Sequence, residues 1–350
     1  MSGKSRRQAK SRRIGWSQTT NLQLLGGIAL LYGFFALSYS STWLTRGNTE
    51  NIARQGAVLL VISLAQMFAL LIGGFDISVG ANMGFTGVVV ALMMTVHGTG
   101  IVLGIIVGLA IASLIGFVNG VLIGGLGVSA FATTLGMLTF LIGFGNVLAN
   151  GQSIGELPDD FKYVGGADWG PVPSGLALAG LAAVFAWVVL RRLRLGLYIY
   201  AIGGSRNTSR LAGVRTVWYE IVAYTLCGFM AGVAGIMLAS RLSVGQTESG
   251  TGYELLSIAT AVIGGVAIGG GVGTVTGVVL GAILIQVLST GLDIAGVGDY
   301  QQAMITGVVI VLAGLVGVLR TKSPRQLIRV VVETVRTARF QRREGLRVER

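Results

Sequence analysis

The chain contains ten predominantly apolar runs, and this pattern constrains its fold more than any other feature. A helix needs roughly 17 to 25 apolar residues to cross the hydrocarbon core of a bilayer, which is about 30 Å thick. Asp, Glu, Lys and Arg make up only 11% of the residues and hydrophobic residues 53%, whereas about 25% of a soluble chain is charged. We therefore predict an all-α polytopic membrane protein with about ten transmembrane helices. The expected spans are residues 22–41, 52–72, 78–96, 101–123, 129–149, 174–190, 217–239, 254–269, 273–290 and 301–319.

Glycine is abundant, with 56 residues, and its spacing bears on how the helices end and pack. Runs 254–269 and 273–290 are separated only by Gly270, Gly271 and Val272, so they form either a tight helical hairpin or one broken element. We expect some helices to be short or broken by glycine. Other glycines recur four residues apart, which lets helix backbones approach closely in lipid and predicts a compact bundle. These pairs are Gly104 and Gly108, Gly116 and Gly120, Gly228 and Gly232, and Gly277 and Gly281.

The net charge of +12 lies in two tails, half of it in residues 1–20 and half in residues 321–350. Positive charge favours the cytoplasmic side of a membrane, so an even number of spans puts both termini in the cytoplasm, together with the Arg-rich stretch 191–215. The stretches 151–173 and 292–300 are acidic and are expected outside. This pattern indicates contact with membrane lipid and not with nucleic acid.

Three regions follow from this distribution. Residues 1–21 are expected to form a basic cytoplasmic tail, residues 22–319 the transmembrane domain, and residues 320–350 a second basic cytoplasmic tail. The first span is too long for the apolar region of a signal peptide and is interpreted as an uncleaved anchor. The second tail after Pro324 forms either an amphipathic helix on the membrane surface or a basic solvated extension.

Several chemical functions are excluded by residue counts. Cys227 is the single cysteine and His97 the single histidine, so an intrachain disulfide, a Cys-based metal site and a His-based triad are not expected. We predict no catalytic residue, no metal site and no cofactor bound by this chain.

The segment 73–80 places a carboxylate, Asp76, between two apolar runs and among glycines that would interrupt a helix. An ionisable group at membrane depth usually faces a cavity or a pathway. Alternatively, Asp76 or Ser78 caps a helix that starts at Ile77. From depth and glycine content, a pathway or gate is predicted at Asp76, Ser78, Asn82, Gly264, Gly265, Gly270 and Gly271.

The basic loop 200–213 lies between the sixth and seventh expected spans. Ser205 can cap a helix of about two turns that ends near Gly213, with Arg206 and Arg210 on one side. Such a helix suits docking to a cytoplasmic partner, whereas a loop that is merely positive needs no helix.

No phosphate-binding loop is present in the sequence. The glycine-rich stretches lack the Gly-Lys-Ser triplet, and the one such triplet, at residues 3–5, has no room upstream for the required earlier glycine. The chain therefore carries no ATP-hydrolysing motif of its own, and we predict that it is not itself an enzyme.

Four segments together resemble a known family. GGFDISVGA (73–81), YAIGGSRNTSRLAGV (200–214), SGTGYELLSIATAVIGG (249–265) and LSTGLDIAGV (288–297) are similar to permease subunits of bacterial ATP-binding-cassette importers for ribose and related simple sugars. The resemblance covers about residues 22–319. Leu256 departs from it, since the family often has an acidic residue there.

The resemblance implies a multi-pass protein of the bacterial inner membrane that imports a monosaccharide by alternating access. It further implies a second permease copy, a cytoplasmic ATPase that uses ATP and Mg, and a periplasmic or lipid-tethered sugar-binding protein. The loop expected to couple to the ATPase comprises Gly203, Gly204, Ser205, Arg206, Arg210, Leu211 and Gly213. The binding protein is expected to dock on the acidic outer residues Asp159, Asp160 and Glu248.

Three other functions remain open from the sequence. An ion-coupled secondary transporter would need a coupling carboxylate, for which Asp76 is the candidate. An importer permease for branched-chain amino acids or nucleosides would share the glycine-rich blocks. A non-transporting scaffold would not need helices broken by glycine at mid-depth.

Overall fold

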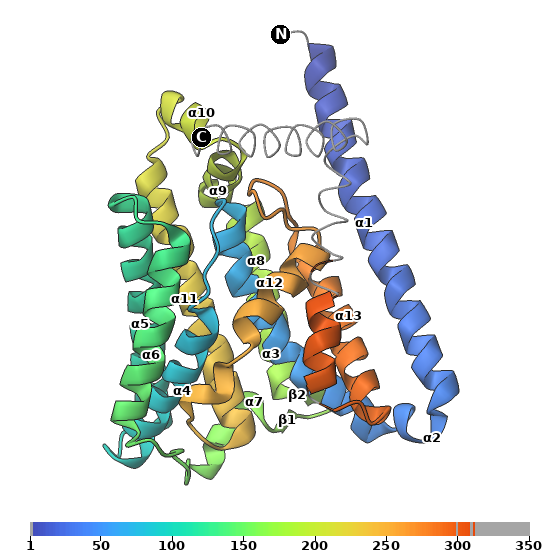
Figure 1. Ribbon diagram of the computed structural model, residues 1–350, viewed down its shortest axis with the longest axis vertical. Helices are drawn as coiled ribbons and strands as arrows, with labels where there is room; N and C mark the ends of the chain where they lie inside the picture. Colours follow the sequence, from blue (N-terminus) through green and yellow to red (C-terminus); the bar gives the residue numbers. More distant parts are fainter. Residues whose placement is uncertain (1–2, 299, 309–310, 312–350) are drawn as a thin grey trace, which may run out of the picture.

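The structure is a computed structural model that describes residues 3–298, 300–308 and 311 (Figure 1). The predicted tail 320–350, with its amphipathic helix, and much of the expected span 301–319 lie outside the described residues. The long helices are α1 (Gly3–Ser38), α3 (Arg46–Leu71), α4 (Val79–Thr95), α5 (Ile101–Gly120), α6 (Ala130–Leu148), α8 (Ser174–Arg191), α11 (Thr216–Leu242) and α13 (Val275–Ile294). Shorter elements are α2 (Ser40–Trp43), the π-helix η1 (Val121–Gly125), the 3-10 helices η2 (Asp159–Phe161) and η3 (Thr247–Gly250), α7 (Lys162–Gly165), α9 (Arg194–Gly204), α10 (Arg206–Leu211) and α12 (Tyr253–Ile263). Strands β1 (Asp168–Trp169) and β2 (Val172–Pro173) form an antiparallel pair.

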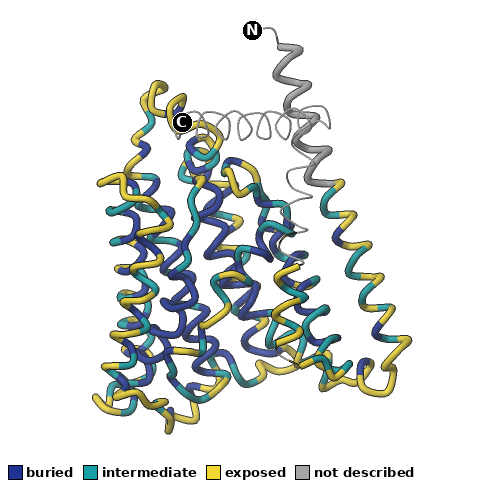
Figure 2. Tube along the Cα trace, viewed as in Figure 1, coloured by how far each residue is buried: buried dark blue, intermediate teal, exposed yellow. Residues whose placement is uncertain are grey.

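The helices form a bundle around α3 and α11. Every residue of α3 from Ala57 to Leu71 is buried, and α11 packs against α5, α3 and α4. Figure 2 shows the buried residues in the middle of the bundle and the exposed ones along its periphery and ends. Helix α1 lies at one flank, where it packs on α13 (Figure 1).

Seven helices in the described residues are long and apolar enough to cross a membrane. They correspond to the expected spans 22–41, 52–72, 101–123, 129–149, 174–190, 217–239 and 273–290, and the chain is therefore an α-helical polytopic protein. Helix α4 corresponds to the expected span 78–96 and has 17 residues. The backbone of α1 is continuous from Gly3, so residues 3–21 of the predicted tail continue the helix of the first span.

One expected span is much shorter than predicted. Helix α12 has 11 residues and ends at Ile263, not at residue 269, because the chain turns at Gly264 and Gly265 into an irregular connection that leads to α13. The structure therefore has a hairpin whose first limb is short. Helices short or broken by glycine are confirmed at this position.

The α5–α11 contact shows what the paired glycines do. A Cβ added at Gly116 would overlap the carbonyl oxygen of Tyr224 and lie 3.0 Å from Cα of Gly228. The reverse holds for Gly228, whose Cβ would lie 2.9 Å from Cα of Gly116. The two backbones thus touch directly. This confirms the packing role predicted for these glycines, since lipid offers no hydrophobic drive for helix association.

We expect Gly116→Ala to lower the free energy of unfolding by about 1–3 kcal/mol, because its methyl group overlaps backbone atoms that cannot move aside. Gly136→Ala on α6 is the matched control, since a Cβ there meets nothing within 4 Å. Alanine also favours helix over glycine by about 0.5–1 kcal/mol, so the control should be neutral or stabilising. Thermal unfolding in mild detergent measures both, and equal melting temperatures would contradict the packing account.

Candidate functional site

The segment between α3 and α4 is extended chain that re-enters the bundle. Helix α3 ends at Leu71, and Gly73 adopts a φ of +88°, a conformation that favours glycine. At Gly74 there is no room for a side chain because the hydroxyl of Tyr224 occupies the place of a Cβ. In Figure 1 this segment runs back alongside the helices before α4 begins. Helix α4 starts at Val79, one residue after the start of the expected span 78–96 and two after the Ile77 start of the capping alternative.

Asp76 is buried in this segment, with 2% of its surface exposed. Its Oδ1 accepts hydrogen bonds from the backbone N–H and the hydroxyl of Ser78, at 2.9 and 2.5 Å. Its Oδ2 lies 3.4 Å from Nδ2 of Asn119 and 3.8 Å from Sγ of Cys227. The amide of Gln66, oriented to suit its neighbours, bonds the backbone N–H and C=O of Asp76 at 3.1 and 3.0 Å. Helices α5 and α11 thus contribute to holding the carboxyl group, and α3 holds the backbone of the same residue.

These contacts decide how Asp76 and Ser78 act locally. Ser78 occupies the N-cap position of α4, but its hydroxyl donates to Asp76 and makes no capping bond. Asp76 instead receives the backbone N–H of Ser78. No ion pair to Asp76 occurs in the described part of the chain, so its carboxyl oxygens are matched by hydrogen-bond donors. The pathway or gate role of this segment stays a prediction.

Asn82, Asn119 and Gln66 show how polar groups enter this apolar bundle. Asn82 donates to the carbonyl oxygen of Ala112 at 3.2 Å and so ties α4 to α5. Asn119 donates to the Ser78 hydroxyl at 3.0 Å, while its own Oδ1 is buried without a partner. Sequence reasoning did not single out Asn119 or Gln66. The signal was available, because each is an amide inside an otherwise apolar run.

The basic loop forms the short helix that the sequence predicts. The Ser205 hydroxyl accepts the backbone N–H of Thr208 at 3.3 Å, α10 follows, and Gly213 has a φ of +81°. Helix α10 protrudes at one end of the bundle (Figure 1). At its tip Leu211 is 90% exposed and Arg210 is also exposed.

The two arginines of α10 differ in their surroundings, although the sequence placed them together. Nε of Arg206 lies 2.7 Å from Oε1 of Glu220, its Nη2 donates to Oε2 at 2.8 Å, and Nη2 also lies 3.4 Å from the carbonyl oxygen of Gly124. Arg206 therefore fastens α10 to α11 and to the π-helix η1. Arg210 forms no ion pair with any residue that the structure describes. It is free to meet a partner.

The predicted glycines of the α12–α13 connection need their backbone freedom or their small size. Gly265, Gly270 and Gly271 have φ values of +87°, +83° and +72°. A Cβ at Gly264 would lie 2.6 Å from the carbonyl oxygen of Gly277 on α13. The connection lies at the same end of the bundle as α9 and α10 (Figure 1). It is therefore a structural neighbour of the predicted coupling loop.

Of the acidic residues expected to dock a binding protein, Asp159 and Asp160 in η2 directly precede α7, which lies with β1 and β2 toward the other end of the bundle (Figure 1). Asp159, Asp160 and Glu248 are all exposed. The ammonium of Lys162, 2.7 Å from Oδ1 of Asp159, lowers the pKa of that carboxyl by hydrogen bonding and charge. Glu248 accepts a hydrogen bond from Nδ2 of Asn146 at 2.8 Å. This docking role stays a prediction.

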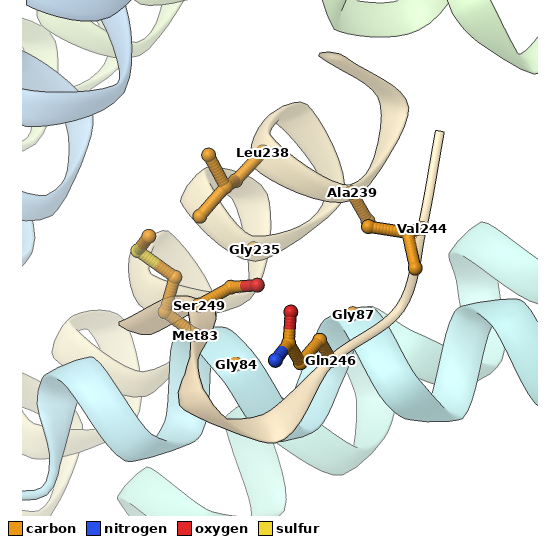
Figure 3. Close-up of a pocket in the computed structure, with 9 residues that line it drawn as sticks. All are labelled: Met83, Gly84, Gly87, Gly235, Leu238, Ala239, Val244, Gln246 and Ser249. Carbon is orange, nitrogen blue, oxygen red and sulfur yellow. The ribbon is translucent and has the colours of Figure 1, made fainter. Parts of the chain in front are cut away.

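The segment carrying Glu248 is held close against α4. Its carbonyl at Thr247 occupies the place of a Cβ at Gly84, and α4 in turn touches α11, since a Cβ at Gly235 would overlap the carbonyl of Met83. Figure 3 shows the small pocket left between these elements, with the side chains of Gln246 and Ser249 at its edge. Glycine backbones again set the distance between the parts.

Comparison with known proteins identifies the family. The model of the family described as branched-chain amino acid transport system / permease component matches residues 48–314, which is most of the chain. The chain belongs to this permease family. It is accordingly a multi-pass protein of the inner membrane and a transport subunit.

Curated members of this family are similar over nearly their whole length. The ribose import permease protein of Escherichia coli (strain K12) is 37% identical over 282 residues, which is 79% of this chain and 87% of the relative. The ribose import permease protein of Bacillus subtilis (strain 168) is 34% identical, over 77% and 84%. The D-allose transport system permease protein of Escherichia coli (strain K12) is 30% identical, over 85% and 90%. These relatives confirm the resemblance to sugar-importer permeases. No solved structure matches the permease.

We expect Asp76→Leu to destabilise the permease by about 1–3 kcal/mol, because it leaves the N–H and hydroxyl of Ser78 without their acceptor and removes one of the two acceptors of the Asn119 amide. Asp76→Asn keeps one acceptor oxygen and should cost less. Asp160→Leu on the exposed loop is the control and should change little. If all three variants melted together with the wild type in detergent, hydrogen bonding to Asp76 would not stabilise this segment.

Proposed function

We propose that the permease is the membrane-spanning subunit of an ATP-driven importer for a monosaccharide such as ribose. A separate cytoplasmic ATPase would hydrolyse ATP with Mg, a periplasmic or lipid-tethered protein would deliver the sugar, and a second permease copy would complete the pathway. The relatives, a ribose import permease and a D-allose transport system permease, support a sugar over a branched-chain amino acid, the substrate that the family description mentions. The permease would bind no cofactor itself.

The main support for this proposal is that α10 is held in place while its tip is exposed. Arg206 anchors the helix through Glu220, while Arg210 and the 90% exposed Leu211 face away from the bundle. An exposed leucine beside an unpaired cation suits a partner with an apolar groove and an acidic rim. Helix α7, which directly follows the turn with Asp159 and Asp160, lies toward the opposite end, where a sugar-delivering protein would dock (Figure 1).

Ion-coupled transport at Asp76 is the less favoured alternative. A coupling carboxylate must exchange its ligand during transport, whereas Asp76 is 2% exposed and already accepts hydrogen bonds from Ser78 and Asn119. These bonds suit a structural carboxylate.

Copurification tests the ATPase partner. We expect a cassette ATPase to purify with the tagged wild-type permease in mild detergent and to be lost from Arg210→Glu combined with Leu211→Asp. That variant changes the free face of α10 and leaves the Arg206–Glu220 pair intact. The matched control exchanges the paired charges, Arg206→Glu with Glu220→Arg, and should retain the ATPase because attraction is preserved. Loss of the ATPase in the control but not in the tip variant would place docking elsewhere.

Uptake into proteoliposomes tests the substrate class. With the copurified ATPase, a binding protein and internal ATP, we expect labelled D-ribose to accumulate and labelled leucine not to accumulate. Omission of ATP should abolish uptake. Leucine accumulation would favour the amino-acid alternative, and uptake without the ATPase would favour ion coupling.

A further inference from the structure

Three chain segments that are distant in sequence meet at the end of α9 that leads into α10. They are the end of α3 at Leu71–Gly73, the end of α9 at Gly203–Gly204, and the α12–α13 connection at Gly270–Gly271. The backbone N–H of Gly271 donates to the carbonyl oxygen of Leu71 at 2.9 Å. We call this meeting point the glycine junction.

The glycine junction is closed to side chains. A Cβ at Gly203 would overlap the carbonyl oxygen of Leu71 and the nitrogen of Gly271. A Cβ at Gly270 would lie 2.7 Å from the nitrogen of Gly73 and 2.9 Å from Cα of Gly203. The three backbones are therefore in direct contact. A displacement of one cannot be absorbed by a yielding side chain.

Tyr200 adds a directed bond to this contact. It lies on α9, one turn before Gly203, and its hydroxyl donates to the carbonyl oxygen of Gly273 at 2.9 Å. Burial raises the pKa of Tyr200 to about 12, so the hydroxyl keeps its proton at physiological pH. Helix α9 is thus joined to the α12–α13 connection by a side-chain hydrogen bond and by direct contact between the two backbones.

The junction connects the docking helix to the buried segments. Ser205 alone separates α9 from α10, so the two helices move together unless the backbone changes its conformation at that residue. From the junction, α3 leads directly into the segment that holds Asp76, and the connection leads into α12 and α13. We propose that the Tyr200–Gly273 hydrogen bond and the glycine junction transmit movement of α10 to these segments, with Tyr200 as a positioning residue. This inference rests on the proposed function, because it assumes an ATPase that moves α10.

Tyr200→Phe tests the directed bond with minimal change in shape. Loss of one hydrogen bond at a moving contact should lower the amount of D-ribose transported per ATP hydrolysed about fivefold. ATPase copurification and basal ATP hydrolysis should stay at the wild-type level, which loss of folding would not allow. Tyr198→Phe is the control, since the hydroxyl of Tyr198 makes no hydrogen bond to any described residue, and it should transport normally.

Gly203→Ala tests the backbone contact. The methyl group at Gly203 should separate the segments and lower the transport-to-hydrolysis ratio about tenfold. Gly180→Ala on α8, outside the coupling loop and the glycine junction, is the control, since its methyl group meets nothing within 4 Å and should leave the ratio unchanged. If Gly203→Ala fails to assemble, Tyr200→Phe decides.

Wild-type ratios in Tyr200→Phe or in assembled Gly203→Ala would overturn the transmission role. A parallel fall of transport and hydrolysis would also overturn it, because the ratio would be unchanged. Absence of ATP-dependent D-ribose uptake in the wild type would instead overturn the proposed function, and the transmission role with it.

Discussion

Direct backbone contact between helices is the constraint on which this permease depends. Hydrophobicity cannot drive helices together in lipid, so association relies on close van der Waals contact and on hydrogen bonds between segments. Gly116 and Gly228 bring α5 onto α11, Gly235 brings α11 onto α4, and Gly84 admits the segment at Thr247. The same rule operates at the glycine junction. A chain with 56 glycines can keep its irregular segments inside the bundle because neighbouring backbones satisfy and enclose them.

The polar groups inside the bundle follow a complementary rule. Asp76 lies where the chain is extended, and donors on its own segment and on α5 and α11 face its oxygens. An isolated carboxylate would be costly at this depth, whereas one surrounded by donors fixes the course of its segment. The arrangement of the helices and the hydrogen bonds to Asp76 therefore together determine where α4 begins.

Much of this architecture could be predicted from the sequence because apolar length and local capping are short-range properties. The local sequence pattern predicts seven of the spans, the Ser205 cap and the turn at Gly213. It does not predict the length of α12, because the apolar run continues past Ile263 while the tertiary contact of Gly264 with Gly277 ends the helix.

Side-chain partners across the fold were also missed. Arg206 was expected to share a free face with Arg210, but Glu220, the one acidic residue between Arg191 and Arg241, lies next to it in space. A single acidic residue within this basic stretch could have indicated an ion pair with one of the arginines. The meeting of Gly73, Gly203 and Gly270 has no such indication in the sequence, since it depends on how three distant segments pack.

The Arg206–Glu220 pair has a consequence for the kinetics of association. A six-residue helix does not hold its shape alone in water, yet α10 is already fixed by this pair and by its cap. A partner therefore meets an ordered surface and loses no free energy to ordering it on contact. Encounter with α10 should accordingly be limited by collision and orientation, with the lifetime of the complex set at its exposed tip.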